Sequence, residues 1–171
     1  MSAAQMSWHA VVPKPVFRLL DVVELYVPAL AFLTLFIVFN AQIFARYILH
    51  SPLSWSTEIS QLAFVWTALL GASYMRRMHG HIAFDMVFEM YSERGKVLAT
   101  MASNMLVAIA CIGSVPPTIE YLTFLGTEYT PMLHIPFSYG FAPLLVFLVM
   151  VGAYSVLDIL SALSGLARGA A

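Results

Sequence analysis

The sequence predicts an all-α membrane protein with four transmembrane helices and with both termini in the cytoplasm. Apolar residues make up 61% of the chain and charged residues only 10%, whereas soluble domains carry about a quarter charged residues. Four apolar runs are each long enough to cross a hydrocarbon core of about 30 Å. Seven of the eight Lys and Arg residues lie on one side of these runs, the side that short-loop Lys and Arg mark as cytoplasmic. We therefore expect residues 1–171 to form a single membrane domain.

The basic residues on the cytoplasmic side flank the runs or fall between the second and third of them. They are Lys14, Arg18, Arg76, Arg77, Arg94, Lys96 and Arg168. Arg46, between the first and second runs, is the exception. The formal net charge is −1, and basic residues spread as membrane flanks give no indication of a nucleic-acid partner.

The first two spans are predicted at residues 22–44 and 56–75. Asp21 and Glu24 stand at the cytoplasmic start of the first span, where the positive end of the helix dipole favours acidic groups. The second span carries small residues at helical spacing, namely Ser60, Ala63, Thr67 and Gly71. Such a face lets another helix approach closely, although the same spacing also arises by chance in an alanine-rich helix.

The last two spans are predicted at residues 97–121 and 137–160. Pro116 and Pro117 interrupt the third span, and each removes a backbone donor. The helix is therefore expected either to kink or to end near Val115. Pro143 is placed in the first turns of the fourth span, where proline is best tolerated.

An interfacial amphipathic helix is predicted between the second and third spans, over residues 82–93. Its apolar residues surround a narrow stripe formed by Asp85, Glu89, Ser92 and Glu93, and that spacing is helical. Anionic lipid would not attract an acidic stripe. A protein partner therefore fits this helix at least as well as a bare membrane surface does.

The sequence carries no pattern typical of an enzyme or of a cofactor site. Nucleotide-binding and hydrolase motifs are absent, and the middle of every span lacks charge. Glu58 lies one turn inside the second span and Glu120 at the outer end of the third, so the deep carboxylate that a small multidrug exporter needs is missing. The histidines lie at helix ends or in loops, so no facing pair is available for haem. Cys111 is the only cysteine and is expected to be a small buried residue.

One face of the second span combines aromatic and acidic residues: Trp55, Glu58, Leu62 and Trp66 recur every three or four positions. Trp55 fits the aromatic belt at the membrane surface. Trp66 lies too deep for the belt, so it indicates either helix packing or contact with a partner. Glu58 is predicted to pair with Arg46 across the short external loop.

These residues resemble the small membrane subunit (Q-type, DctQ-like) of tripartite ATP-independent periplasmic (TRAP) transporters. The matching stretch contains Arg46, Trp55, Glu58, Trp66, Gly71, Arg76, Arg77, His79, His81 and Asp85. Residues Thr130, Pro131, Ile135, Pro136 and Pro143 match the segment that leads into the family's last helix. The resemblance covers roughly residues 20–160 of the chain.

The resemblance implies a scaffold subunit in the bacterial inner membrane. Such a subunit pairs with a large sodium-coupled membrane subunit, to which a periplasmic binding protein delivers an organic acid, and it carries no cofactor or substrate site itself. The expected partner contacts are Arg46, Trp55, Glu58, Trp66 and Gly71. The expected anchors at the cytoplasmic interface with membrane lipid are Arg76, Arg77, His81 and Asp85. The alternatives are a free-standing small four-helix transporter or exporter and a membrane-anchored redox subunit.

Overall fold

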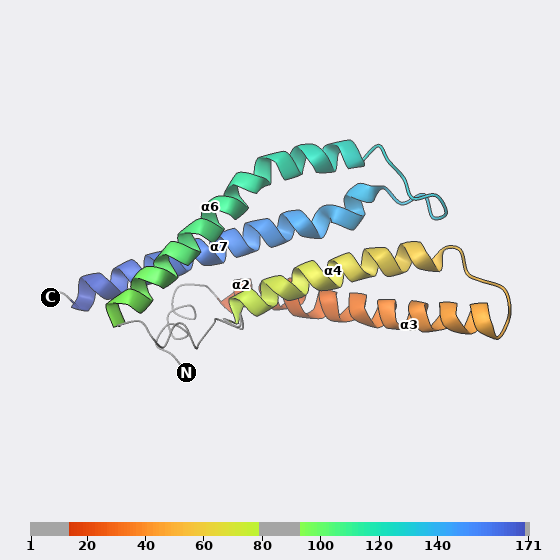
Figure 1. Cartoon of the computed structure of the whole chain (residues 1–171), viewed down its shortest axis with the longest axis horizontal. Coiled ribbons are helices and arrows are strands. Elements are labelled where there is room, and N and C mark those ends of the chain that lie inside the picture. The colour runs from red at the N-terminus through yellow and green to blue at the C-terminus, as the bar shows by residue number, and fades with distance from the viewer. Residues whose placement is uncertain (1–13, 79–92, 170–171) are drawn as a thin grey trace.

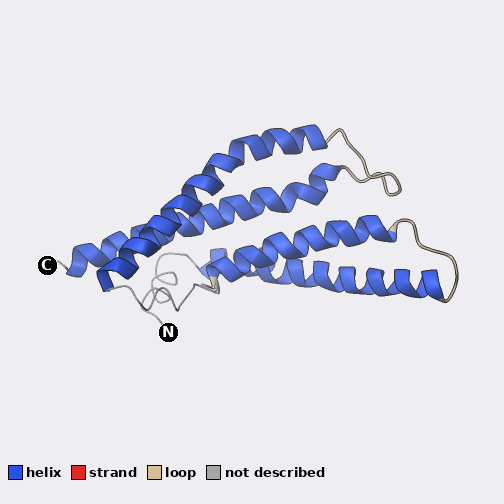
Figure 2. Cartoon of the chain, in the orientation of Figure 1, coloured by secondary structure: helices blue, strands red, loops and turns tan. Residues whose placement is uncertain are grey.

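The chain is all-helical in the part that its computed structural model describes, residues 14–78 and 93–169 (Figure 2). The only extended pairing in those ranges is an isolated bridge between Tyr129 and Pro136. The helices are α2 (Lys14–Asp21), η1 (Val22–Tyr26), α3 (Val27–Tyr47), α4 (Ser56–Arg77), α6 (Glu93–Leu125) and α7 (Phe137–Gly169). The predicted all-α class is confirmed.

Three helical stretches are long and apolar enough to cross a membrane. They are Pro15–Tyr47, which joins α2, η1 and α3, then Leu98–Leu125 in α6 and Phe137–Ala162 in α7. The chain is therefore a multi-pass membrane protein. Helix α4 has 22 residues, enough for about 33 Å at ~1.5 Å per residue. Its Ser, Thr and Gln side chains make it less apolar than the other three.

The predicted starts at residues 56 and 137 are confirmed, but the first helix begins at Lys14, eight residues before the predicted position 22. Apolar patterning marks where a helix enters lipid and not where its backbone hydrogen bonding starts. Pro15 in the first turn suits a helix start, and residues 16–21 continue the helix. Residues 82–92 of the predicted interfacial helix lie outside the described residues, and Glu93 begins α6.

Helix α6 continues through Pro116 and Pro117, which rules out an end near Val115 and leaves the kink of the two predicted alternatives. Figure 1 shows instead that α6 changes direction along its length. The Ser114 hydroxyl donates to the carbonyl of Ala110 at 2.7 Å, and the Thr118 hydroxyl donates to that of Ser114 at 2.6 Å. Such bonds from Ser and Thr to the carbonyl four residues earlier often accompany helix bending, and a bend is the expected response of a helix to proline.

The helices form a row in the order α3, α4, α7, α6 (Figure 1). The extensive contacts join each helix to its neighbour in that row, so α4 and α7 are central and α3 and α6 are the edges. A closed four-helix bundle would instead bury all four helices around one core. Large apolar side chains on the two edge helices consequently remain exposed, for example Phe36 on α3 and Leu106 on α6.

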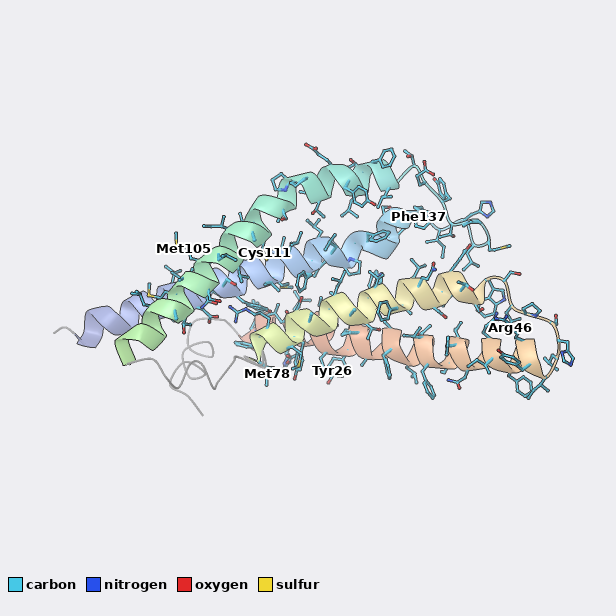
Figure 3. The ribbon with its side chains drawn as sticks, in the orientation of Figure 1. Tyr26, Arg46, Met78, Met105, Cys111 and Phe137 are labelled. Atoms are coloured by element: carbon cyan, nitrogen blue, oxygen red, sulfur yellow. The ribbon has the colours of Figure 1, made fainter. Side chains whose placement is uncertain are left out.

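The row has two distinct ends. The arginine end is where Lys14, Arg77 and Glu93 lie, and the loop end holds the connections 48–55 and 126–136 (Figure 1). Figure 3 shows Met78 toward the first end and Arg46 at the second.

Candidate functional site

A buried charge cluster joins α4 to the first helix and to α7 at the arginine end. The Arg77 Nη2 atom donates to Asp21 Oδ1 at 2.6 Å, and Arg77 Nε lies 2.7 Å from Glu24 Oε2. The Tyr154 hydroxyl of α7 donates to Glu24 Oε1 at 2.6 Å. The Glu24 side chain is fully buried and that of Arg77 is 8% exposed.

The π-helical turn η1 places Glu24 in this cluster. A π turn inserts an extra residue into an α-helix and redirects side chains, and such turns occur often at functional sites. The Arg77 Nε–Glu24 Oε2 contact lacks hydrogen-bond geometry, so it is an ion pair held by charge alone. Removing one partner of a buried ion pair leaves an uncompensated charge and is strongly destabilising.

The neighbouring arginine, Arg76, binds side chains on α6 and α7, the two helices in the other half of the row. Arg76 Nη2 lies 2.7 Å from Asn104 Oδ1 on α6, 3.3 Å from Ser155 Oγ and 3.0 Å from Asp158 Oδ2 on α7. The side chains of Arg76 and Asp158 are each 12% exposed. Consecutive residues point about 100° apart on a helix, so the two arginines of α4 fasten helices on opposite sides of it.

This arrangement corrects two expectations from the sequence. Arg76 and Arg77 are predicted as anchors at the membrane interface, but their guanidinium groups are mostly buried and bind other helices of the same chain. Glu24 is predicted at the helix start, near the interface, but the helix begins ten residues earlier and Glu24 is buried between helices. The spans are therefore not free of buried charge.

Trp66 provides the link between α4 and α7 in the middle of the row. Its indole Nε1 donates to the carbonyl of Tyr139 at 3.1 Å. That carbonyl has no partner within its own helix, because Pro143 stands four residues later and has no N–H. Pro143 is the seventh residue of α7, within the first two turns at about 3.6 residues per turn, where the sequence places it. Trp66 thus takes part in packing between two helices of this chain, and its predicted contact with a partner protein stays a prediction.

Close approach between these helices occurs at Gly140 and not at Gly71. A Cβ on Gly140 would lie 2.6 Å from Leu62 Cδ2, whereas nothing lies within 4 Å of a Cβ on Gly71. Among the small residues predicted on α4, Ala63 is buried, and the Thr67 hydroxyl donates to the carbonyl of Ala63. Gly71 therefore has open space beside it, and its predicted contact with a partner protein stays a prediction.

Glu58 fixes the loop between α6 and α7 at the loop end. Its two carboxylate oxygens accept backbone N–H bonds from Met132 at 2.8 Å and Leu133 at 3.0 Å. Thr130, which is 3% exposed, accepts from the N–H of Ile135 through its hydroxyl at 3.0 Å. The loop is consequently tied to the start of α4.

The predicted Arg46–Glu58 ion pair is wrong. The carboxylate of Glu58 is occupied by the loop amides, and the ion pairs among the described residues do not include Arg46. The guanidinium of Arg46 lies instead 5.8 Å from the ring centroid of Tyr47. Closeness in the sequence across a short loop did not identify the partner of Glu58, because a carboxylate with two oxygens matches two adjacent backbone N–H groups well.

The remaining predicted residues fall into two groups. Trp55 directly precedes α4 and is 41% exposed at the loop end, while His81 and Asp85 lie outside the described residues. Cys111 is buried in α6 beside Gly152, as predicted. Sequence reasoning missed Asp158 as the partner of Arg76, although a lone acidic residue near the end of the fourth apolar run was a usable signal.

Comparison with known proteins identifies the family. Residues 35–165 match the family described as "Tripartite ATP-independent periplasmic transporters, DctQ component". A segment of 81 residues, 47% of this chain, is 33% identical to 13% of the sialic acid TRAP transporter permease protein SiaT of Haemophilus influenzae. A segment of 125 residues, 70% of this chain, is 27% identical to 22% of the uncharacterized protein y4mM of Sinorhizobium fredii.

The matched segments thus span less than two thirds of either relative, while the family match covers well over half of this chain. The chain belongs to the DctQ components of tripartite ATP-independent periplasmic transporters.

Proposed function

We propose that this chain is the fixed scaffold for a large sodium-coupled permease subunit that takes up an organic acid delivered by a periplasmic binding protein. The observation that carries the proposal is the open row of helices. Its edge helices expose long apolar surfaces, and the central helices α4 and α7 each pack against one neighbouring helix on either side. A permanent membrane partner would cover surface that four helices in a row cannot bury among themselves.

The buried charges support a structural role over a transport role for this chain. A carboxylate that carries protons or substrate through a membrane protein must be reachable from a pathway. Glu24, the most deeply buried acidic residue described, is held by Arg77 and Tyr154. Asp158 is likewise held by Arg76. These groups brace helices against one another, so the free-standing exporter remains the weaker alternative.

The histidine positions disfavour the redox alternative. Of the five histidines, the structure describes His50 and His134, which both lie in loops at the loop end. Axial ligation of haem within a bundle needs histidines on facing helices. An absorbance spectrum of the purified protein tests this alternative, because bound haem would give a strong Soret band.

The orientation belongs to the same proposal. The arginine end faces the cytoplasm of a bacterial inner membrane, since Lys and Arg in short loops stay on that side. The loop end, with Trp55 and the Glu58-bound loop, then faces the periplasm. That loop presents Tyr129 and Met132, both more than half exposed, to an arriving binding protein.

Purification of the tagged chain in mild detergent tests the proposal. We expect a multispan membrane protein much larger than this 18.9 kDa chain to remain bound through gel filtration, with its identity as a TRAP permease established by peptide mass spectrometry. Recovery of the chain alone, from cells that express the whole transporter, would contradict the scaffold role.

A further inference from the structure

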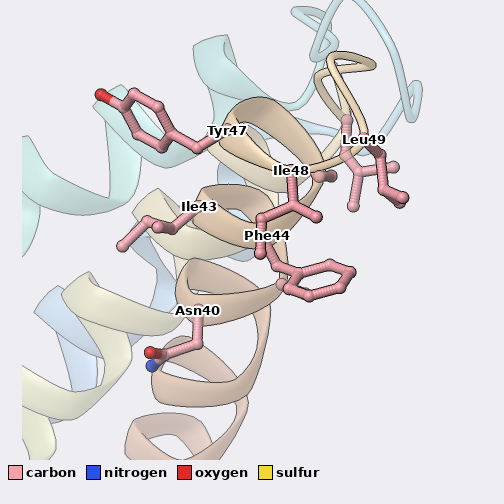
Figure 4. A pocket seen from close by; sticks show the side chains of 9 residues that line it. Asn40, Ile43, Phe44, Tyr47, Ile48 and Leu49 are labelled. Carbon is pink, nitrogen blue, oxygen red and sulfur yellow. The ribbon is translucent and has the colours of Figure 1, made fainter.

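An open-sided apolar hollow lies at the loop end of α3, where the helix runs into the 48–55 connection. Figure 4 shows Phe44, Ile48 and Leu49 among the side chains that line it. Its volume is about 710 Å³, within the range of about 300–1,000 Å³ that is typical of ligand sites. Asn40, deeper along α3, and Tyr47 supply its polar side-chain groups.

The positively charged side chain of Arg46 lies beside this hollow. Tyr47 lines it, and the guanidinium carbon of Arg46 lies 5.8 Å from the centroid of the Tyr47 ring. Arg46 is exposed and pairs with no carboxylate among the described residues, because the nearby Glu58 is occupied by two loop amides. The site therefore combines an uncompensated positive charge with an apolar groove at the end of a membrane-spanning helix.

That combination matches the chemistry of a phospholipid. A guanidinium binds phosphate through two parallel hydrogen bonds, and the apolar side chains of the hollow can pack against an acyl chain through dispersion contacts. Tyr47 suits the boundary between the two parts, since aromatic residues gather at headgroup depth. We propose that this site retains one phospholipid, whose phosphate binds Arg46 and whose acyl chain occupies the hollow between Phe44 and Ile48.

Charge decides between this occupant and a helix of a partner protein. A hydrophobic helix laid in the groove would cover Arg46 without supplying an anion, and a buried unpaired guanidinium is costly. A phospholipid supplies its anion at the depth where Arg46 stands. The inference concerns this chain alone and does not rest on the scaffold role proposed above.

Native mass spectrometry of the delipidated chain in detergent tests the proposal. Phosphatidylglycerol is the ligand, and diacylglycerol with the same acyl chains is the control that lacks phosphate. We expect one phosphatidylglycerol to bind the wild type at least about tenfold more tightly than diacylglycerol does, as loss of a charge-assisted hydrogen bond predicts.

Two variants separate the parts of the site. Arg46→Gln should weaken phosphatidylglycerol binding about tenfold or more and bring it close to that of diacylglycerol. Ile48→Trp keeps the charge, fills the hollow and should weaken both ligands. Arg18→Gln removes an exposed cation at the arginine end and should leave the binding unchanged.

Three results would overturn the proposal. They are equal phosphatidylglycerol binding by wild type and Arg46→Gln, equal binding of the two lipids by the wild type, and an unchanged affinity in Ile48→Trp. Loss of the lipid from wild type when the whole transporter is assembled would also overturn it, because the hollow would then belong to a partner helix.

Discussion

Replacing Arg77 by glutamine should destabilise the protein more than replacing any exposed cation. Arg77 is the group that faces both Asp21 and Glu24, with contacts of 2.6 and 2.7 Å. The Glu24 side chain has no exposure, so in the variant its carboxylate retains only the hydrogen bond from Tyr154 among these contacts. A buried carboxylate without its cation is expensive in an apolar environment.

The magnitude follows from this burial. Removing one partner of a buried ion pair costs about 3–5 kcal/mol, and the half-exposed Asp21 adds little to that figure because solvent screens it. In the double variant Arg77→Gln/Glu24→Gln, both charges disappear together. We expect the double variant to recover about 2 kcal/mol or more of the loss, because neutral side chains of similar size leave no uncompensated charge.

Unfolding of the detergent-solubilised protein by sodium dodecyl sulfate, followed by circular dichroism and tryptophan fluorescence, measures these free energies. Arg18→Gln is the matched control, since Arg18 is exposed at the same end of the molecule. The reasoning is refuted if Arg77→Gln lies within 1 kcal/mol of the control, or if the double variant is less stable than Arg77→Gln.

Further predictions concern the contacts between α4 and α7 and the loop end. Trp66→Phe removes the donor to the Tyr139 carbonyl and should lower the free energy of unfolding by about 1 kcal/mol. Adding Pro143→Ala should restore part of this lost stability in the same titration, because alanine supplies an N–H to that carbonyl. A double variant that is as unstable as Trp66→Phe, or less stable, would contradict this. Gly140→Leu should cost about 1–3 kcal/mol by overpacking, whereas Gly71→Leu, with open space around it, should cost less than 1 kcal/mol. Glu58→Ala should speed hydrogen exchange at the amides of residues 132 and 133, measured by mass spectrometry, while equal protection in the variant would show that the carboxylate does not hold this loop.

The spans were predictable because lipid imposes a simple pattern. Residues 56 and 137 begin helices where polar or proline-containing turns give way to apolar runs, and that transition is visible in the sequence. The first helix extends back to Lys14, since helical hydrogen bonding continues beyond the apolar run. Whether the Pro116–Pro117 pair bends or ends a helix depends on its surroundings in the fold, here the packing of α6 along α7, which composition alone does not decide.

The site was less predictable, because its partners are far apart in the sequence. Arg76 and Asp158 are separated by 82 residues, and only the order of helices in the row brings them together. The π turn that turns Glu24 inward leaves no mark in the apolar pattern. Sequence distance favoured Glu58 as the partner of Arg46, whereas the fold offers Glu58 two amides from a loop 74 and 75 residues away.

Reconstituted uptake tests the scaffold account most directly. Proteoliposomes should be prepared with this chain alone and with this chain plus its large membrane subunit, then supplied with a sodium gradient, the binding protein and a panel of radiolabelled organic acids that includes sialic acid, succinate and pyruvate. The account predicts sodium-driven uptake of an organic acid only when both membrane subunits are present. Sodium-driven uptake by liposomes that contain this chain alone would contradict it.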